Sequence, residues 1–138
     1  MKKIFLLFMV MINAVSIAQD FNIVGKWKGI DTDGKDIFLT FDSNGILNVS
    51  NDIETLGGEP VDTGNGILTG LKYEVNLKKN PFSLDFIMYN FNIEFEMDRK
   101  KGYFKIINDN IIELKQEVFS KEGTRYKDLY KYTFKREL

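Results

Sequence analysis

The segment Ile23-Val24-Gly25-Lys26-Trp27-Lys28-Gly29-Ile30 holds the only tryptophan of this 138-residue chain. Successive side chains of a β-strand point to opposite faces, so Trp27 is expected on one face and Lys26 and Lys28 on the other. Its two glycines allow neighbouring backbone to come close. The segment therefore predicts a strand that buries a large ring where the folded part of the chain begins.

Residues 1–18 have the features of a cleavable signal peptide. Lys2 and Lys3 form a basic start, residues 4–15 are almost wholly apolar, and Ser16-Ile17-Ala18 places small residues at the two positions that a signal peptidase reads. A membrane anchor is the alternative, but the apolar run is shorter than the roughly 20 residues that span a bilayer. We therefore expect cleavage after Ala18 and export of residues 19–138, as a single domain that is not integral to the membrane, to the periplasm or the medium.

The chain has no cysteine and no histidine. An exported domain without cysteine depends on its core rather than on disulfides. Without histidine, the commonest transition-metal ligand and the usual near-neutral general base are missing. After residue 18, 17 basic residues are scattered among 20 acidic ones, so no basic stripe is available for nucleic acid. We expect no metal, no cofactor and no nucleic-acid partner.

The sequence also lacks the common motifs of catalytic sites. The sequence has no Gly-x-Ser-x-Gly elbow and no nucleotide-binding loop. Asp85 with Glu113 or Glu94 would be the carboxylate pair to suspect, but carboxylates facing outward on a half-buried strand are normally solvated. Asp31-x-Asp33-Gly34 and Asp42-x-Asn44-Gly45 contain only isolated parts of a calcium loop. The protein is therefore not expected to be an enzyme, and no catalytic residue is assigned.

Apolar residues recur with a period of two almost throughout residues 19–138, which predicts β-strands. The clearest strand runs from Ile67 to Leu77, and Asn44-Gly45 between two apolar runs is a strong hairpin signal. Eight strands are expected, at residues 23–30, 37–41, 46–50, 67–77, 82–89, 103–107, 111–116 and 129–136. Residues 91–97 form either a ninth, short edge strand or an extended loop.

The expected fold class is all-β, an eight-stranded antiparallel up-and-down β-barrel with no significant helix after the signal peptide. Closure into a barrel removes exposed strand edges, and an open sandwich is the alternative. Asn51 to Gly66, with four glycines and one proline, shows little periodicity. It is expected to be either a lid or rim of the barrel or a disordered connection.

Four segments resemble those of lipocalins and of small bacterial lipocalin-like (calycin-type) extracytoplasmic domains: Gly25-Lys26-Trp27, Thr40 to Gly45, Pro81 to Phe86, and Gly102 to Leu114. The resemblance implies a barrel whose floor is closed by the tryptophan, with an arginine of the last strand stacked on its ring. Arg136 is at the fitting place, and such a contact contributes roughly 0.5 to 2 kcal/mol. A solvated terminal charge is the alternative for Arg136.

The aromatic content points to the barrel interior as the functional site. After residue 18 the chain keeps ten phenylalanines, six tyrosines and one tryptophan. The interior of an eight-stranded barrel is either filled by side chains or holds one small ligand. We expect a small apolar or amphipathic ligand there, contacted by seven aromatic residues, Trp27, Phe41, Tyr73, Phe86, Phe104, Tyr132 and Phe134. The alternative is that these rings form an ordinary packed core.

A second hypothesis is a protein-interaction or envelope-support module with a filled barrel and no small-molecule ligand. Its motivation is an alternation that would place four apolar side chains, Phe91, Ile93, Phe95 and Met97, together on an exposed edge. An exposed apolar patch of this kind is typical of a protein-binding surface.

Overall fold

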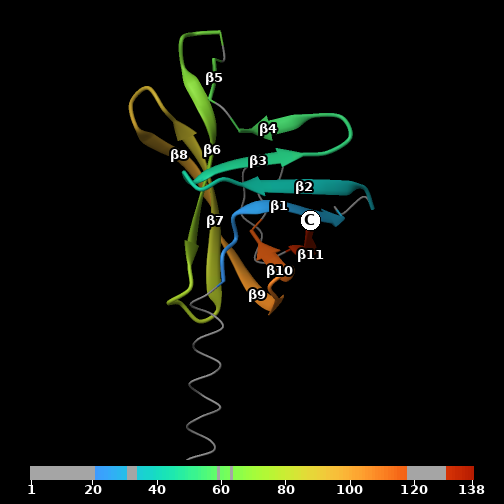
Figure 1. The fold of residues 1–138 in the computed structure, drawn as a ribbon. Coiled ribbons are helices and arrows are strands. Elements are labelled where there is room, and N and C mark those ends of the chain that lie inside the picture. The colour runs from blue at the N-terminus through green and yellow to red at the C-terminus, as the bar shows by residue number, and fades with distance from the viewer. Residues whose placement is uncertain (1–20, 31–33, 59, 63, 118–129) are drawn as a thin grey trace, which may run out of the picture.

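The computed structural model describes residues 21–30, 34–58, 60–62, 64–117 and 130–138, without the side chain of Tyr130. The expected signal peptide, residues 1–18, lies outside the described residues. Within them the structure is all-β and contains no helix (Figure 1).

Eight strands close into an antiparallel barrel: β1 (Gly25–Ile30), β2 (Asp36–Phe41), β3 (Ile46–Ser50), β6 (Leu68–Asn76), β7 (Phe82–Asn90), β9 (Gly102–Asn108), β10 (Ile111–Gln116) and β11 (Tyr130–Arg136). Each strand pairs with the next in this order, and β11 pairs with β1, where Trp27 lies opposite Arg136. The expected up-and-down barrel is therefore confirmed, and the open sandwich is excluded.

Three further strands lie outside this ring. β4 (Thr55–Gly57) pairs with β3, β5 (Val61–Asp62) pairs with β6, and β8 (Phe95–Lys100) pairs with β7. Figure 1 shows β5 and β8 beside the upper ends of β6 and β7, above β1 and β2 in the view. The expectation of an irregular stretch at residues 51–66 was wrong in part, because β4 and β5 fall within it. Both are too short and too exposed to show an apolar alternation.

The ninth strand is also displaced from its expected position. Residues 91–94 form a turn, and the strand begins at Phe95. The turn is fastened to the start of β6, because the amide of Phe91 donates to the carbonyl of Leu68 at 2.8 Å and the amide of Leu68 donates to the Asn92 side chain. Glu94 completes the turn with a φ of +51°. These local hydrogen bonds override the alternation of residues 91–97.

Residues 99–102 are part of an extended segment, although a run of basic residues before a glycine is typical of a turn. β8 and β9 are separated only by Lys101, and both pair with β7 in one register, Lys100 opposite Phe86 and Tyr103 opposite Ser83. Gly102 makes this possible, since a Cβ there would lie 2.6 Å from the carbonyl oxygen of Leu84. The two strands together form one long wall element of the molecule.

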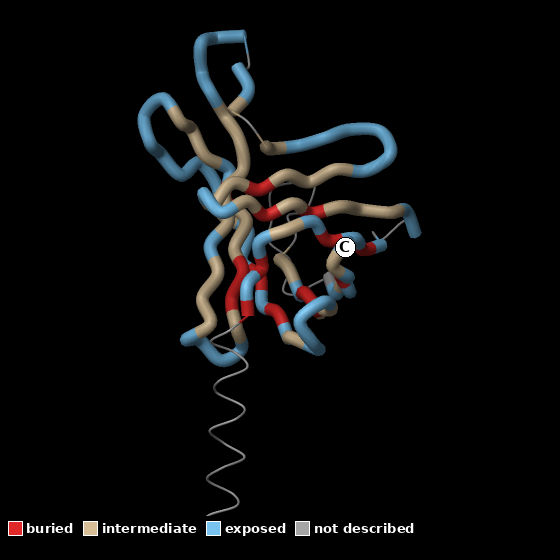
Figure 2. Tube along the Cα trace, viewed as in Figure 1, coloured by how far each residue is buried: buried red, intermediate tan, exposed pale blue. Residues whose placement is uncertain are grey.

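The core fills one end of the barrel. Its fully buried large side chains are Trp27, Phe41, Phe134, Leu39, Leu47, Leu84, Ile112 and Leu114. Figure 2 shows that the buried positions gather on β1, β2, β3, β10 and the lower part of β7, whereas the upper end of the molecule is intermediate or exposed. The barrel therefore has a packed floor and a less filled mouth.

Candidate functional site

The floor is organised around Trp27, which is fully buried. Its indole Nε1 donates a hydrogen bond to the carbonyl of Ile23 at 2.8 Å, so the polar atom of the ring is satisfied in the core. The guanidinium carbon of Arg136 lies 4.3 Å from the centroid of the indole ring. The stacked pair that the sequence resemblance implies is thus present in the structure.

Arg136 also joins three separate segments of backbone. Its Nη1 donates to the carbonyl of Val24 at 2.8 Å and its Nη2 to that of Asn22 at 2.7 Å. Its Nε and Nη2 both donate to the carbonyl of Asp109, at 3.2 and 3.1 Å. Arg136 is therefore no solvated terminal charge: it ties the segment before β1 and the β9–β10 turn to β11.

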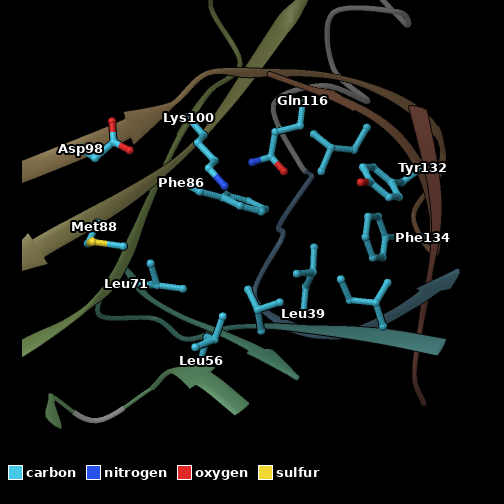
Figure 3. Close-up of a pocket in the computed structure, with 13 residues that line it drawn as sticks. Leu39, Leu56, Leu71, Phe86, Met88, Asp98, Lys100, Gln116, Tyr132 and Phe134 are labelled. Atoms are coloured by element: carbon cyan, nitrogen blue, oxygen red, sulfur yellow. The ribbon is translucent and has the colours of Figure 1, made fainter. Parts of the chain in front are cut away.

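A cavity of about 250 Å³ occupies the other end of the barrel, the mouth. Ten of its lining residues are apolar or aromatic: Ile37, Leu39, Val49, Leu56, Leu71, Phe86, Met88, Leu114, Tyr132 and Phe134. The remaining three are Asp98, Lys100 and Gln116. Figure 3 shows these side chains arranged around a common space. The alternative of an interior filled by side chains therefore describes the floor but not the mouth.

The apolar and polar groups lie on different walls of the cavity. β2, β3, β4 and β6 contribute five aliphatic side chains, Ile37, Leu39, Val49, Leu56 and Leu71. The three polar groups come from β8 and β10. Figure 3 shows Lys100 and Gln116 on one side of the space and Leu39, Leu56 and Leu71 on the opposite side. The cavity is therefore amphipathic.

Strand register explains why Lys100 and Gln116 face the same space. Gln116 pairs with Gly102, and Gly102 lies two residues after Lys100 on the same face of the extended segment. Along β10, Gln116 lies two residues after Leu114, which is buried in the core. Both polar side chains consequently follow the inward face of the barrel up to its mouth.

The side-chain nitrogen of Gln116 stands out among the described residues. Its Nε2 is buried and has no hydrogen-bond partner within the part of the chain that the structure describes. A buried amide nitrogen without an acceptor costs about 1–3 kcal/mol, so most such groups in folded proteins are satisfied by protein or by water. This donor lies at the wall of the cavity (Figure 3).

The seven aromatic residues expected to contact a ligand divide between the two ends of the barrel. Phe86, Tyr132 and Phe134 line the cavity. The other four, Trp27, Phe41, Tyr73 and Phe104, do not line it and belong to the packed core or lie against it. The structure thus brings three of the expected residues together around a space and places the others below it.

Tyr73, one of the seven aromatic residues expected to contact a ligand, lies outside the cavity lining and contacts the β2–β3 turn. Its hydroxyl donates to the carbonyl of Asp42 in the β2–β3 turn, and its ring meets that of Phe41 edge-on at 4.8 Å. Partial burial, together with the Asp42 carboxylate, raises the pKa of the Tyr73 hydroxyl. The side chain therefore fastens a turn to the barrel.

Lys100 and Gln116 were not among the expected site residues. Lys100 lies in the Arg99-Lys100-Lys101-Gly102 stretch, whose charged side chains and glycine are typical of a polar turn. A signal for Gln116 was present, because it continues the inward alternation of Ile112 and Leu114. A polar residue at the end of an apolar inward series is therefore informative about the mouth of such a barrel.

The outer face of the same wall carries an ion-pair network centred on Arg99. Its Nη1 donates to Glu74 and to Asp85 at 2.8 Å each, and its Nε and Nη2 donate to Glu96. The hydrogen bond from Arg99 lowers the pKa of Glu96, and the three carboxylates raise the pKa of Arg99. The network joins β6, β7 and β8 on the face opposite the cavity.

The described residues contain no group of three or more acidic side chains placed to hold a metal ion. The same residues include no helix with the length and hydropathy needed to cross a bilayer.

The chain was compared with known proteins. No family model matches it, and a search of curated proteins finds none that is significantly similar. The cavity and the residues that line it are therefore the features that bear on its function.

Proposed function

We propose that this protein binds a small apolar or amphipathic molecule in the mouth of the barrel. The observation that carries the proposal is the cavity of about 250 Å³ with ten apolar or aromatic lining residues. Small-molecule sites in proteins are concave, mostly apolar and provided with a few placed polar groups, with volumes from about 300 Å³ upward. The cavity has this character, and its volume of about 250 Å³ lies just below this range.

We further propose that the protein is a lipocalin-like domain that acts outside the cytoplasm. The closed eight-stranded ring and the stacking of Arg136 on Trp27 support kinship with that family. The basic and apolar composition of residues 1–18 supports export to the periplasm or the medium. The role proposed is binding rather than catalysis.

The proposal is tested by filling the cavity. Val49→Phe adds a ring at the aliphatic wall, and Val61→Phe makes the same change on exposed β5, outside the lining. Isothermal titration calorimetry with 1-octanol should show at least tenfold weaker binding for the first variant and unchanged binding for the second. Equal binding by both variants and the wild type would place the ligand outside the barrel. Native mass spectrometry of the gently purified protein would reveal a carried ligand as additional mass.

A protein-binding surface is a second candidate function, favoured by exposed apolar side chains at β8 and the turn before it. Ile93, Phe95 and Met97 are 68%, 57% and 49% exposed. Phe91 is not equivalent, because its ring packs against Tyr89 at 5.1 Å. Replacement of Ile93 and Phe95 by serine should abolish capture of a partner without changing the circular dichroism spectrum. Persistent capture by the double variant would count against this surface.

A further inference from the structure

The polar groups of the cavity suggest what part of a ligand they would recognise. Lys100 and Gln116 reach the same space from neighbouring inward positions on the β8–β9 segment and β10. An ammonium group has only donors, and the amide nitrogen of Gln116 also only donates. The group that fits both is therefore a hydrogen-bond acceptor, and the charge of Lys100 favours a negative one.

The amide nitrogen of Gln116 gives the strongest indication that the ligand brings a hydrogen-bond acceptor. Its Nε2 is buried and without a partner in the described part of the chain, although it lies at the cavity wall. An acceptor brought by a ligand would satisfy this donor and remove the cost of its burial. Figure 3 shows the amide nitrogen of Gln116 and the ammonium of Lys100 on the same side of the cavity, near the ring of Phe86.

Asp98 limits the charge of the ligand. It lines the cavity two residues before Lys100, opposite Met88, whereas Lys100 lies opposite Phe86. Since like charges repel, this carboxylate disfavours a doubly charged head such as a phosphate more strongly than a singly charged one. A singly charged, planar carboxylate needs only the two donors.

The volume of the cavity limits the size of the ligand's apolar body. A volume of about 250 Å³ divided by roughly 30 Å³ for a water-sized group corresponds to about eight non-hydrogen atoms. The wall opposite Lys100 and Gln116 is aliphatic, with Leu39, Leu56 and Leu71 (Figure 3). A short hydrocarbon body would lie there while its head remains on the polar wall.

We propose that the ligand is an amphipathic monocarboxylate with a short apolar body, its carboxylate held by Gln116 Nε2 and Lys100 Nζ. The proposal rests on the proposed binding function and specifies the chemical class. Gln116 and Lys100 determine specificity, and the aliphatic wall provides affinity.

The test compares three probes that share an eight-carbon chain: octanoate, 1-octanol and octylammonium. In calorimetric titrations of the full chain at neutral pH, octanoate should bind about tenfold or more tightly than octanol, since hydrogen bonds to charged groups contribute most. Equal affinity for octanoate and octanol, or tighter binding of octylammonium, would overturn the carboxylate proposal and leave the proposed function standing. If none of the three bound, the proposed function would fail as well.

Substitutions test whether Lys100 and Gln116 cause the preference for octanoate over octanol. Lys100→Met and Gln116→Leu should each weaken octanoate binding about tenfold and change octanol binding less than twofold. Lys101→Met is the matched control, because Lys101 is exposed and lies on the outer face one residue further on. An equal loss in that control would show nonspecific attraction and contradict the assignment. Lys100→Glu should reverse the preference from octanoate to octylammonium, a change that a purely structural role of Lys100 would not produce.

Discussion

Arg136 lies over the ring of Trp27 while its donors hold the carbonyls of Asn22, Val24 and Asp109. One side chain near the end of the chain thus closes the floor of the barrel. A cation–π contact of roughly 0.5–2 kcal/mol and net hydrogen bonds of about 1 kcal/mol each act at the same place.

Arg136→Met should accordingly lower the free energy of unfolding by about 2–3 kcal/mol, because methionine keeps some packing but none of the hydrogen bonds. Urea unfolding followed by circular dichroism measures the change. Lys135→Met, on the exposed face of the same strand, should change stability by less than about 0.5 kcal/mol. A similar loss in both variants would mean that the floor contacts contribute little.

Gly102→Ala should destabilise the protein by about 2–3 kcal/mol through overpacking. The new Cβ would lie 2.6 Å from the carbonyl oxygen of Leu84 and 3.2 Å from that of Lys115, and backbone atoms yield little. Thermal unfolding of this variant beside Lys101→Ala, at an exposed neighbouring position, gives the measurement. A melting temperature within a degree of the wild type would show that β7, β9 and β10 separate easily at this point.

The ion-pair network of Arg99 should make the free energy of unfolding slightly smaller at acid pH. Arg99 lowers the pKa of Glu96 in the folded protein, so the ionised carboxylate favours folding. This contribution is complete above the ordinary glutamate value near 4.3 and is lost as pH falls through the lowered folded-state pKa. Because Glu96 is partly exposed, the contribution should be below about 1 kcal/mol.

Glu96→Gln should therefore lower the free energy of unfolding at pH 7 by a few tenths of a kcal/mol, and the difference from wild type should vanish near pH 2. Urea unfolding of both proteins at a series of pH values measures this difference in the free energy of unfolding. Glu94→Gln makes the same chemical change in the adjacent turn, outside the ion-pair network of Arg99, and is the matched control. A difference that grew with acidity would have the wrong sign for this pair.

Chain length should determine affinity until the cavity is full. From butanoate to octanoate, each added methylene should tighten binding about threefold to fourfold, corresponding to about 0.8 kcal/mol per buried CH₂. Beyond about eight to ten non-hydrogen atoms the gain should level off, because 250 Å³ is then occupied. Calorimetry along this series provides the check. Steady tightening through hexadecanoate would indicate a site much larger than the cavity.

Sequence patterns predicted the ring of the barrel because its strands have one apolar face. β6 and β7 show this best, with Leu71, Tyr73 and Val75 paired with Met88, Phe86 and Leu84 on the inward face. The closed floor was expected from the resemblance to lipocalins, which implied that Arg136 stacks on Trp27, and not from the strand pattern. β4 and β5 were not predictable, because strands of three and two residues carry no periodicity.

The mouth was predicted only in part, since its form depends on contacts between segments distant in sequence. Phe86, Tyr132 and Phe134 were expected from their inward positions. Lys100 was not, because its place follows from the pairing of β8 with β7 and from the close approach that Gly102 permits. A run of charged residues beside a glycine looks like a turn until this pairing is known.

Because the packed floor and the cavity lie at opposite ends of the barrel, the ligand preference of the protein can be changed by substitutions at the mouth. Trp27 and Arg136 hold the barrel closed at one end, while Lys100, Gln116 and Leu56 sit around the cavity at the other. These three side chains do not belong to the buried core, so they can be exchanged without removing a core contact. Leu39, Leu114 and Phe134 line the cavity and also belong to the core, so they would be kept. The same scaffold is therefore suited to carrying a family of engineered receptors for short molecules, differing only in a few side chains at the mouth.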